Sequence, residues 1–413
     1  MTGQHGMASG EGGLSAPHEA CGLSPRGYLG QDEKAPVVQG WCPGALRPMM
    51  SGDGLVVRVR PRLGRLRADQ ARGIAQLAAV YGNGLIDLSA RANVQMRGVT
   101  EAGHAALIAG LRALDLVDET VAQETRRNII VQPFAVEGDE TLRIAADLAA
   151  RLAQADAPEL PGKFGFAVDA GPVRVLEGTA CDIRIERHDD ALWVRPDGTR
   201  LGVRVGADEA AAAAVDLARW FLEMGGVRDG RGRMAALMAR QGVVLPFAAT
   251  GLPDAPAVPA PAPGPCAGGW LVAFEFGQMQ AETLATLADL GDLRVTPWRM
   301  LLVEGAGQAP ALPGVITNPA DPMLRVVACT GAPGCVQARA ATRPLARALA
   351  PHLDRPLHVS GCAKGCAHPT AADLTLTATS GGFALIRGGT AADAPLSLHS
   401  EAALIARPSL LTE

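Results

Sequence analysis

The stretch VSGCAKGCAHP, from Val359 to Pro369, places Cys362 and Cys366 four residues apart among glycines and a closing proline. Neither a long helix nor a central strand suits this composition, so the stretch is predicted to be a tight loop. Upstream, ACTGAPGC puts Cys329 and Cys335 six residues apart in a second loop rich in glycine and proline. Four thiols on two tight loops indicate a bound metal centre.

Length and composition limit the number of domains, the partners and the cellular compartment that can be expected. The chain has 413 residues, of which 48% are hydrophobic, and this suits two to four domains of ordinary size. The net charge of −4 gives no overall attraction to nucleic acid or anionic lipid. No apolar run reaches the roughly 18 residues of a spanning helix, and the first 40 residues lack a signal-peptide core. We therefore expect a cytoplasmic protein without a membrane or nucleic-acid partner, in which cysteines favour metal or redox roles.

The remaining cysteines do not form a second pattern. Cys21 lies in an N-terminal extension that is predicted to be disordered, and Cys266 lies in a predicted linker. Cys181, in the alternating stretch ACDIRIERH, is predicted to be a packed thiol, whereas the role of Cys42 stays open.

The spacing of the four loop cysteines, C-x5-C-x26-C-x3-C, fits zinc poorly, because zinc sites usually use C-x2-C pairs. Iron–sulfur cubanes accept more varied spacing, so the pattern favours a [4Fe–4S] cluster, with zinc and free thiols as alternatives. Cys335 is expected to open a helix, CVQARAATRPLARALAPHL, whose N-terminus would favour an anionic cluster.

Two segments show the order strand, helix, strand. GLVVRVRPRLGRL (54–66) begins as a strand, ADQARGIAQLAAVYG (68–82) has helical spacing, and GLIDLSARANVQMRGV (84–99) is predicted to return as a strand. The helical stretch EAGHAALIAGLRALDLVD follows it. The same order recurs from Gly269 to Gly305, which suggests an internal duplication, although chance similarity of two such units stays open. Between the copies, TGLPDAPAVPAPAPGPCAGG (250–269) has the composition of an exposed linker.

ACTGAPGC and GCAKGC together resemble the cluster motif of the siroheme-dependent sulfite and nitrite reductases. The resemblance implies a [4Fe–4S] cluster held by Cys329, Cys335, Cys362 and Cys366, with Cys366 as the residue that also touches siroheme iron in that family. It implies an α+β fold with two ferredoxin-like half-domains and two α/β domains, which accounts for the duplicated units. The expected segments are a disordered leader (1–40), half-domain 1 (41–105), α/β domain 1 (106–249), a linker (250–268), half-domain 2 (269–310) and the cluster-binding α/β domain 2 (311–413).

Three basic segments match the family's ligand-binding segments. In SARANVQMRGV, a single strand would place Arg91, Asn93, Gln95 and Arg97 on one face. ETRRNIIVQ supplies Arg127 and Asn128, and LPGKFGFAV supplies Lys163. By resemblance these residues bind the substrate, although a solvated strand face is the simpler alternative for the first set. The family's second lysine is replaced by Gly165, which weakens oxyanion reduction and is expected to open space beside the site.

Further stretches point to one branch of the superfamily. CPGALRPMMSGDGLVVRVRPRLGRL, LPGKFGFAVDAG, TPWRML and HVSGCAKGCAHP together resemble the precorrin-3B synthases of cobalamin biosynthesis, over nearly everything from residue 41 to 405. The resemblance implies an O2-dependent monooxygenase that hydroxylates precorrin-3A at C20 and forms a γ-lactone. It implies an electron donor as a further partner and adds a mononuclear non-haem iron whose ligands cannot be identified. His358 and His368 flank the second cysteine pair and are expected to lie near the cluster or at the surface rather than to bind iron.

Two other functions stay open on the sequence. A siroheme-dependent sulfite or nitrite reductase is the first, and the substitution at Gly165 argues against it. A ferredoxin-like electron carrier is the second, but three basic ligand segments are more than such a protein needs. Catalytic residues are not identified.

Overall fold

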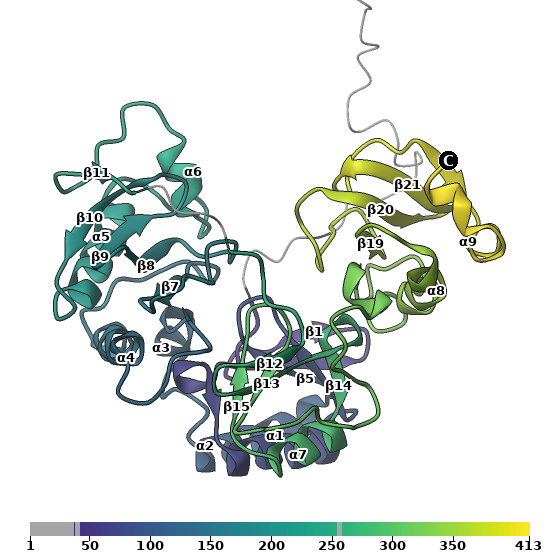
Figure 1. Ribbon diagram of the computed structural model, residues 1–413, viewed down its shortest axis with the longest axis horizontal. Helices are drawn as coiled ribbons and strands as arrows, with labels where there is room; N and C mark the ends of the chain where they lie inside the picture. The colour runs from purple at the N-terminus through teal and green to yellow at the C-terminus, as the bar shows by residue number, and fades with distance from the viewer. Residues whose placement is uncertain (1–36, 38–41, 254–257) are drawn as a thin grey trace, which may run out of the picture.

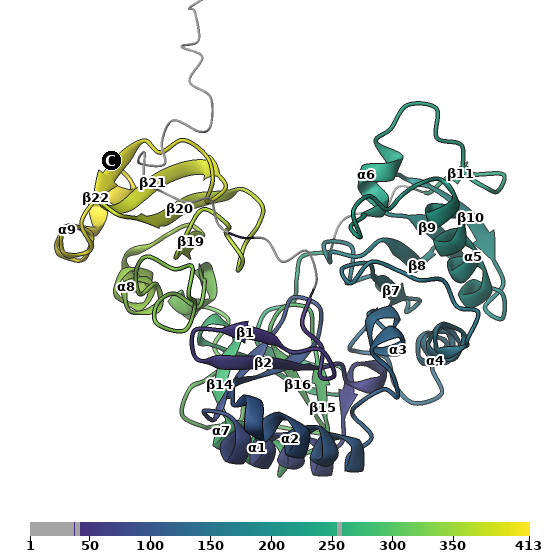
Figure 2. The same cartoon turned by 180° about the vertical axis from the view of Figure 1, so that it is seen from behind.

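The computed structural model describes residue 37 and residues 42–253 and 258–413. The predicted disordered leader, apart from Val37, lies outside the described residues. Two α/β domains stand on opposite sides of a central lobe (Figure 1), and helices α1, α2 and α7 cover the face of the central sheets that points away from both domains (Figure 2). In the described part of the chain, no helix is both long and apolar enough to cross a bilayer.

The central lobe contains the two ferredoxin-like units. The strands of its first sheet are, in order, β1 (Met49–Ser51), β2 (Gly54–Val59), β5 (Val94–Val99), β4 (Leu85–Leu88) and β14 (Gln278–Gln280). Those of the second are β12 (Gly264–Cys266), β13 (Gly269–Phe274), β16 (Leu301–Glu304), β15 (Leu293–Val295) and β3 (Arg65–Leu66), with β17 (Val315–Ile316) also beside β13. The helices are α1 (Ala68–Tyr81), α2 (Glu101–Ala113) and α7 (Ala281–Ala288). Both units contribute to one apolar core.

The two units exchange a strand. β14, encoded in the second unit, pairs with β4 of the first, and β3, encoded in the first, pairs with β15 of the second. Before each exchanged strand a non-glycine residue has a left-handed conformation, Leu63 with φ 52° and Phe276 with φ 58°. The same holds between the hairpin strands, at Ala92 (φ 52°) and Arg299 (φ 60°). These matched features confirm the predicted duplication.

An ion pair is also duplicated, with its charges reversed. The pairing of β14 with β4 and of β3 with β15 makes Asp87 equivalent to Arg294. Asp87 pairs with Arg97 at 3.2 Å, whereas Arg294 pairs with Glu304. The link between neighbouring strands has been kept while its polarity has been inverted.

The first α/β domain has a six-stranded sheet. Its strands are, in order, β11 (Thr250–Gly251), β10 (Leu201–Val205), β9 (Ala191–Pro196), β8 (Ile183–His188), β7 (Phe166–Asp169) and β6 (Ile129–Val131). Its helices are α3 (Val121–Arg126), α4 (Glu140–Ala153), α5 (Ala210–Glu223) and α6 (Met234–Met238). The second α/β domain repeats this arrangement with β18 (Val326–Ala328), β19 (Leu357–Ser360), β20 (Ala372–Thr379), β21 (Gly382–Gly389), β22 (Ser397–His399), α8 (Arg343–Leu349) and α9 (Glu401–Ala406).

The registers of the two α/β sheets coincide. In each, the first three strands are parallel and the next ones antiparallel. The amide of Cys329 donates to Val359 O at 2.9 Å, and the amide of Gln132 donates to Val168 O at 3.0 Å. Cys329 is therefore the counterpart of Gln132, and the duplication includes the α/β domains.

Several sequence predictions are wrong in detail. Residues 84–99 form a hairpin, β4 and β5, rather than one strand. Cys335 does not open a helix, because α8 begins only at Arg343. The predicted linker begins as edge strand β11 and ends as edge strand β12, which contains Cys266. Helix α2 packs against α1 and so belongs with the first ferredoxin-like unit, beyond the predicted boundary at residue 105.

Candidate functional site

The four cysteines lie on two neighbouring loops of the second α/β domain. Cys329 directly follows β18, and Cys362 lies two residues after β19. The loops are joined by the amide of Arg339, which donates to Gly361 O at 2.8 Å. A Cβ at Gly361 would lie 2.7 Å from that of Ala338, so this close approach requires glycine.

The thiols are close enough to influence one another. The pKa of Cys366 is raised to about 11, first by desolvation of its sulfur and then by Cys329, Cys362 and Cys335. The pKa of Cys362 is raised by burial and by Cys335 and Cys329. A cubane holds four sulfurs around an inorganic cube and so spaces them more widely than a single ion does. The mutual influence of four thiols on two glycine-tightened loops fits such a cluster.

Cys329 has the richest surroundings of the four. Its sulfur accepts a hydrogen bond from the amide of Ala367 at 3.4 Å, and lies 3.4 Å from Ser360 Oγ and 3.6 Å from His358 Nε2. His358 is buried, and its pKa is lowered to about 4 by desolvation, with smaller effects from His368 and Arg299. Burial thus disfavours the charged ring, and Nε2 lies within reach of the Cys329 sulfur. Cys366 is the exposed member of the set.

Two arginines of the central lobe hold the cysteine loops. Arg97 Nη2 donates to Gly334 O at 3.1 Å, inside the loop between Cys329 and Cys335. Arg299 Nη2 donates to Ala367 O at 2.6 Å, beside Cys366. Each loop is thereby attached to one ferredoxin-like unit.

Residues predicted to share one strand face are separated by the hairpin. Only Gln95 and Arg97 lie within β5, whereas Arg91 and Asn93 precede it, because Ala92 has a left-handed backbone. Arg97 is buried, and besides the cysteine loop it pairs with Asp53 at 2.7 Å and with Asp87. Gln95 accepts from Arg58 at 2.9 Å, while Asn93 is buried and its Nδ2 has no partner among the described residues.

Arg91 and Lys163 come together at the junction with the first α/β domain. Arg91 Nη1 donates to the backbone oxygen of Lys163 at 2.7 Å. Both side chains also act electrostatically on Cys42, as does Arg58. The structure thus gathers three cations around the cysteine whose role the sequence left open.

Arg127 and Asn128 are largely engaged within the protein. Arg127 pairs with Asp118 at 2.8 Å and donates to Arg60 O at 3.0 Å. Asn128 Nδ2 donates to Phe164 O at 2.9 Å and is buried. In this arrangement both residues fix the backbone around the junction.

Gly165 does not open space, contrary to the sequence-based expectation. A Cβ at this position would lie 2.6 Å from Asn128 Nδ2 and 3.1 Å from Asn128 O. The room a side chain would need is filled by Asn128 itself.

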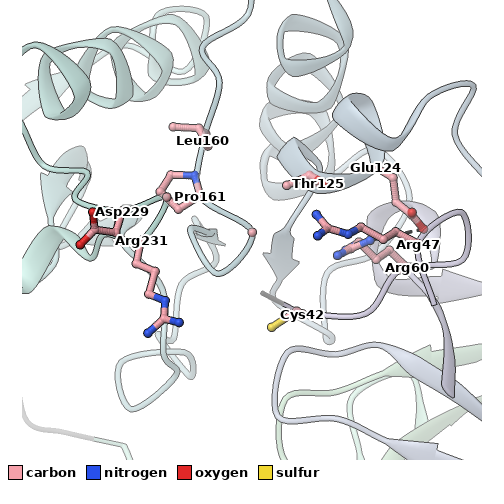
Figure 3. Close-up of a pocket in the computed structure, with 12 residues that line it drawn as sticks. Cys42, Arg47, Arg60, Glu124, Thr125, Leu160, Pro161, Asp229 and Arg231 are labelled. Atoms are coloured by element: carbon pink, nitrogen blue, oxygen red, sulfur yellow. Dashed lines mark ion pairs between the residues drawn. The ribbon is translucent and has the colours of Figure 1, made fainter. Parts of the chain in front are cut away.

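A cavity of about 360 Å³ lies between the central lobe and the first α/β domain (Figure 3). Its lining includes Cys42, Arg47, Arg60, Glu124 and Arg231. Arg60 is buried and lies 3.4 Å from Glu124, while its Nε and Nη1 have no hydrogen-bond partner among the described residues. Sequence reasoning missed Arg58 and Arg60, although their alternation with Val57 and Val59 in VVRVR was a usable signal.

Comparisons with known proteins agree with this architecture. A model of the nitrite/sulfite reductase ferredoxin-like half domain matches residues 47–114. The solved structure of the NirA protein of Mycobacterium tuberculosis matches with a TM-score of 0.63, over 86% of this chain and 79% of that one, at 18% identity. The chain has the nitrite/sulfite reductase fold. The predicted fold class is confirmed.

Within the nitrite/sulfite reductase fold, one curated relative is similar over nearly its full length. A precorrin-3B synthase from Sinorhizobium sp. is 28% identical over 420 residues, which cover 92% of this chain and 89% of the relative. The predicted resemblance to the precorrin-3B synthases is confirmed by this similarity.

Proposed function

We propose that the chain is a precorrin-3B synthase. The observation that carries this proposal is the similarity to the Sinorhizobium synthase, because it extends over 92% of this chain and 89% of that protein. The similarity to NirA, at 18% identity, supports the fold alone.

The proposed cofactor is a [4Fe–4S] cluster held by Cys329, Cys335, Cys362 and Cys366. When bound, such a cluster supplies electrons one at a time at a potential that hydrogen bonds to its sulfurs adjust. Arg97 and Arg299 hold the two loops in place, and Ala367 N–H and His358 are placed to donate to the Cys329 sulfur. No three His, Cys, Asp or Glu side chains of the described chain are arranged to hold a single ion, so we assign no ligands to a non-haem iron.

The proposed substrate, precorrin-3A, is a flat macrocycle with many carboxylates. Arg58, Arg60, Arg91 and Lys163 lie along the junction between the central lobe and the first α/β domain. Guanidinium groups match carboxylates with paired hydrogen bonds, so this junction is suited to orient the acidic side chains of the ring. Arg127 and Asn128 would fix the backbone of this junction through the ion pair with Asp118 and the hydrogen bond to Phe164 O.

The proposed reaction inserts one atom of O2. C20 gains a hydroxyl, the ring A acetate closes to a γ-lactone, and the net gain of the macrocycle is one oxygen atom. The second oxygen atom leaves as water, which requires two electrons and two protons from the donor. A siroheme in the same space would exclude this substrate.

The test is a single-turnover reaction of anaerobically purified protein with precorrin-3A, a reductant and ¹⁸O2. We expect a product heavier than the substrate by one ¹⁸O atom, and a protein spectrum with a broad iron–sulfur absorption that dithionite bleaches. Sharp haem-type bands together with sulfite or nitrite reduction would refute the synthase and favour the siroheme reductase.

The Cys362→Ser variant tests the ligand set. We expect it to lose iron and labile sulfide, because three thiolates and a hydroxyl hold a cubane poorly. Cys266→Ser is the matched control, since Cys266 lies on edge strand β12 of the central lobe and not on either cysteine loop. Full retention of cluster by Cys362→Ser would reject the assignment.

A further inference from the structure

Cys42 occupies the cavity at the junction of the central lobe and the first α/β domain. It is partly buried, and Figure 3 shows its sulfur directed into the cavity, between the guanidinium groups of Arg60 and Arg231. The backbone that follows is fixed by Glu124, whose carboxylate accepts from the amides of Ala45 and Leu46. The thiol is therefore held on a fixed segment and faces the space assigned above to an anionic ligand.

Three cations act on this thiol. Burial alone would raise the pKa of Cys42, but the positive charges of Arg58, Arg91 and Lys163 lower it. Two thiols elsewhere behave in the opposite way: burial raises the pKa of Cys181 to about 12 and also raises that of Cys266. Because the thiolate is the nucleophilic form, these surroundings favour reactivity at Cys42.

The same cavity also contains a buried cation with unused hydrogen-bond donors. Arg60 is 5% exposed and lines the cavity. Its Nε and Nη1 have no hydrogen-bond partner in the described structure, and Nη1 reaches Glu124 only at 3.4 Å. A buried guanidinium with unused donors is costly unless an anion completes its hydrogen bonds.

We propose that Cys42 is a reactive nucleophile whose neighbouring cations also bind the carboxylates of the tetrapyrrole. Two anions that use the same cations oppose each other, so a bound macrocycle suppresses the reactivity of the thiol by charge as well as by shielding. The identity of the ligand rests on the proposed function, whereas the reactivity of the free thiol does not.

The experiment is alkylation of the cluster-loaded protein by iodoacetamide under anaerobic conditions at pH 7. The thiolate attacks the CH2 carbon, a C–S bond forms, and iodide leaves, so each event adds one carbamidomethyl group. We expect Cys42 to react about tenfold faster than Cys266, which serves as an internal control in the same digest. Arg58→Gln should slow the reaction at Cys42, and Arg58→Lys, which keeps a cation, should preserve much of it.

Uroporphyrin III, a tetrapyrrole with eight carboxylates, is the ligand probe. We expect it to slow alkylation of Cys42 by about tenfold or more and to leave Cys266 unchanged. Equal alkylation rates at Cys42 and Cys266, or no effect of Arg58→Gln, would refute the enhanced reactivity of Cys42. Fast alkylation that uroporphyrin does not slow would overturn the shared site.

The outcome separates this inference from the proposed function. Conversion of precorrin-3A by a protein whose Cys42 is unreactive would reject the inference alone. A reactive and protected Cys42 in a protein that converts no precorrin-3A would reject the function and keep the inference.

Discussion

Adding a single methyl group at Gly165 should destabilise the first α/β domain, because Asn128 fills the space where the family has a lysine side chain. In Gly165→Ala the new Cβ would meet Asn128 Nδ2 at 2.6 Å and Asn128 O at 3.1 Å. Overpacking of a buried site typically costs about 1–3 kcal/mol. If the Asn128 amide moves away, its bond to Phe164 O is lost inside the protein, at a further cost of about 1–2 kcal/mol. The expected loss of unfolding free energy is therefore about 2–5 kcal/mol.

The matched control is Gly178→Ala in the same domain, because a Cβ there would meet no atom within 4 Å. Urea unfolding followed by the fluorescence of the buried Trp193 and Trp220 reports on this domain. In a double-mutant cycle, Asn128→Ala should reduce the cost of Gly165→Ala, since the two side chains compete for one space. If Gly165→Ala unfolds at the same urea concentration as Gly178→Ala, the packing argument is refuted.

Three further predictions follow from single contacts. Burial raises the pKa of Asp169 to about 6, so the stability that its protonated form adds to the folded protein is complete below about pH 4 and lost as pH rises through 6. Asp169→Asn should remove up to about 3 kcal/mol of this pH dependence from the free energy of unfolding. An unchanged dependence of the unfolding free energy on pH would contradict this prediction. Arg97→Met removes the cation between Asp53 and Asp87, while Asp87 keeps Arg343 at 3.8 Å, so we expect a loss of about 3 kcal/mol and reduced iron content. Arg72→Met, at an exposed position of helix α1, is the control. Wild-type iron content and melting temperature would show that Arg97 does not hold the loop. His358→Phe removes a hydrogen-bond donor near the Cys329 sulfur, so the reduction potential of the cluster should become more negative while the iron content stays full. Redox titration followed by electron paramagnetic resonance measures this potential. An unchanged potential would exclude His358 as a donor.

Local elements were predictable where the sequence carries local signals. Helix α1 was predicted to span 68–82 because apolar residues recur at helical spacing and Gly82 follows, and it spans Ala68–Tyr81. The hairpin within 84–99 was missed because its turn uses Ala92 in a left-handed conformation, with no glycine or proline between Gly84 and Gly98. Glycine or asparagine usually takes the left-handed position of such a turn, but here Ala92 takes it and Asn93 follows, so the signal was weak.

The grouping of the four cysteines was predictable from the sequence, whereas the contacts of the basic residues were not. The spacing of the four cysteines and the family resemblance predicted one shared cluster, and the structure places these cysteines on two neighbouring loops. The partners of Arg97 and Arg127 could not be predicted, because Asp53, Asp118 and Gly334 reach them only through tertiary packing. For the same reason Gly165 was interpreted as open space, although only the position of Asn128 decides that question.

The exchanged strands have a consequence for the order in which the molecule is made. Asp87 of β4 and Gln278 of β14 are hydrogen-bonded at 2.7 Å across 191 positions of the chain. The whole first α/β domain, from β6 to β11, is synthesised between them, and it has its own apolar core. Because domains tend to fold as units while the chain emerges, this inserted domain can fold while the first sheet still lacks its outer strand. Synthesis of the first ferredoxin-like sheet thus begins before the first α/β domain is made and ends after it. A ribosome that stalls before residue 278 leaves strand β4 of that sheet unpaired at its outer edge.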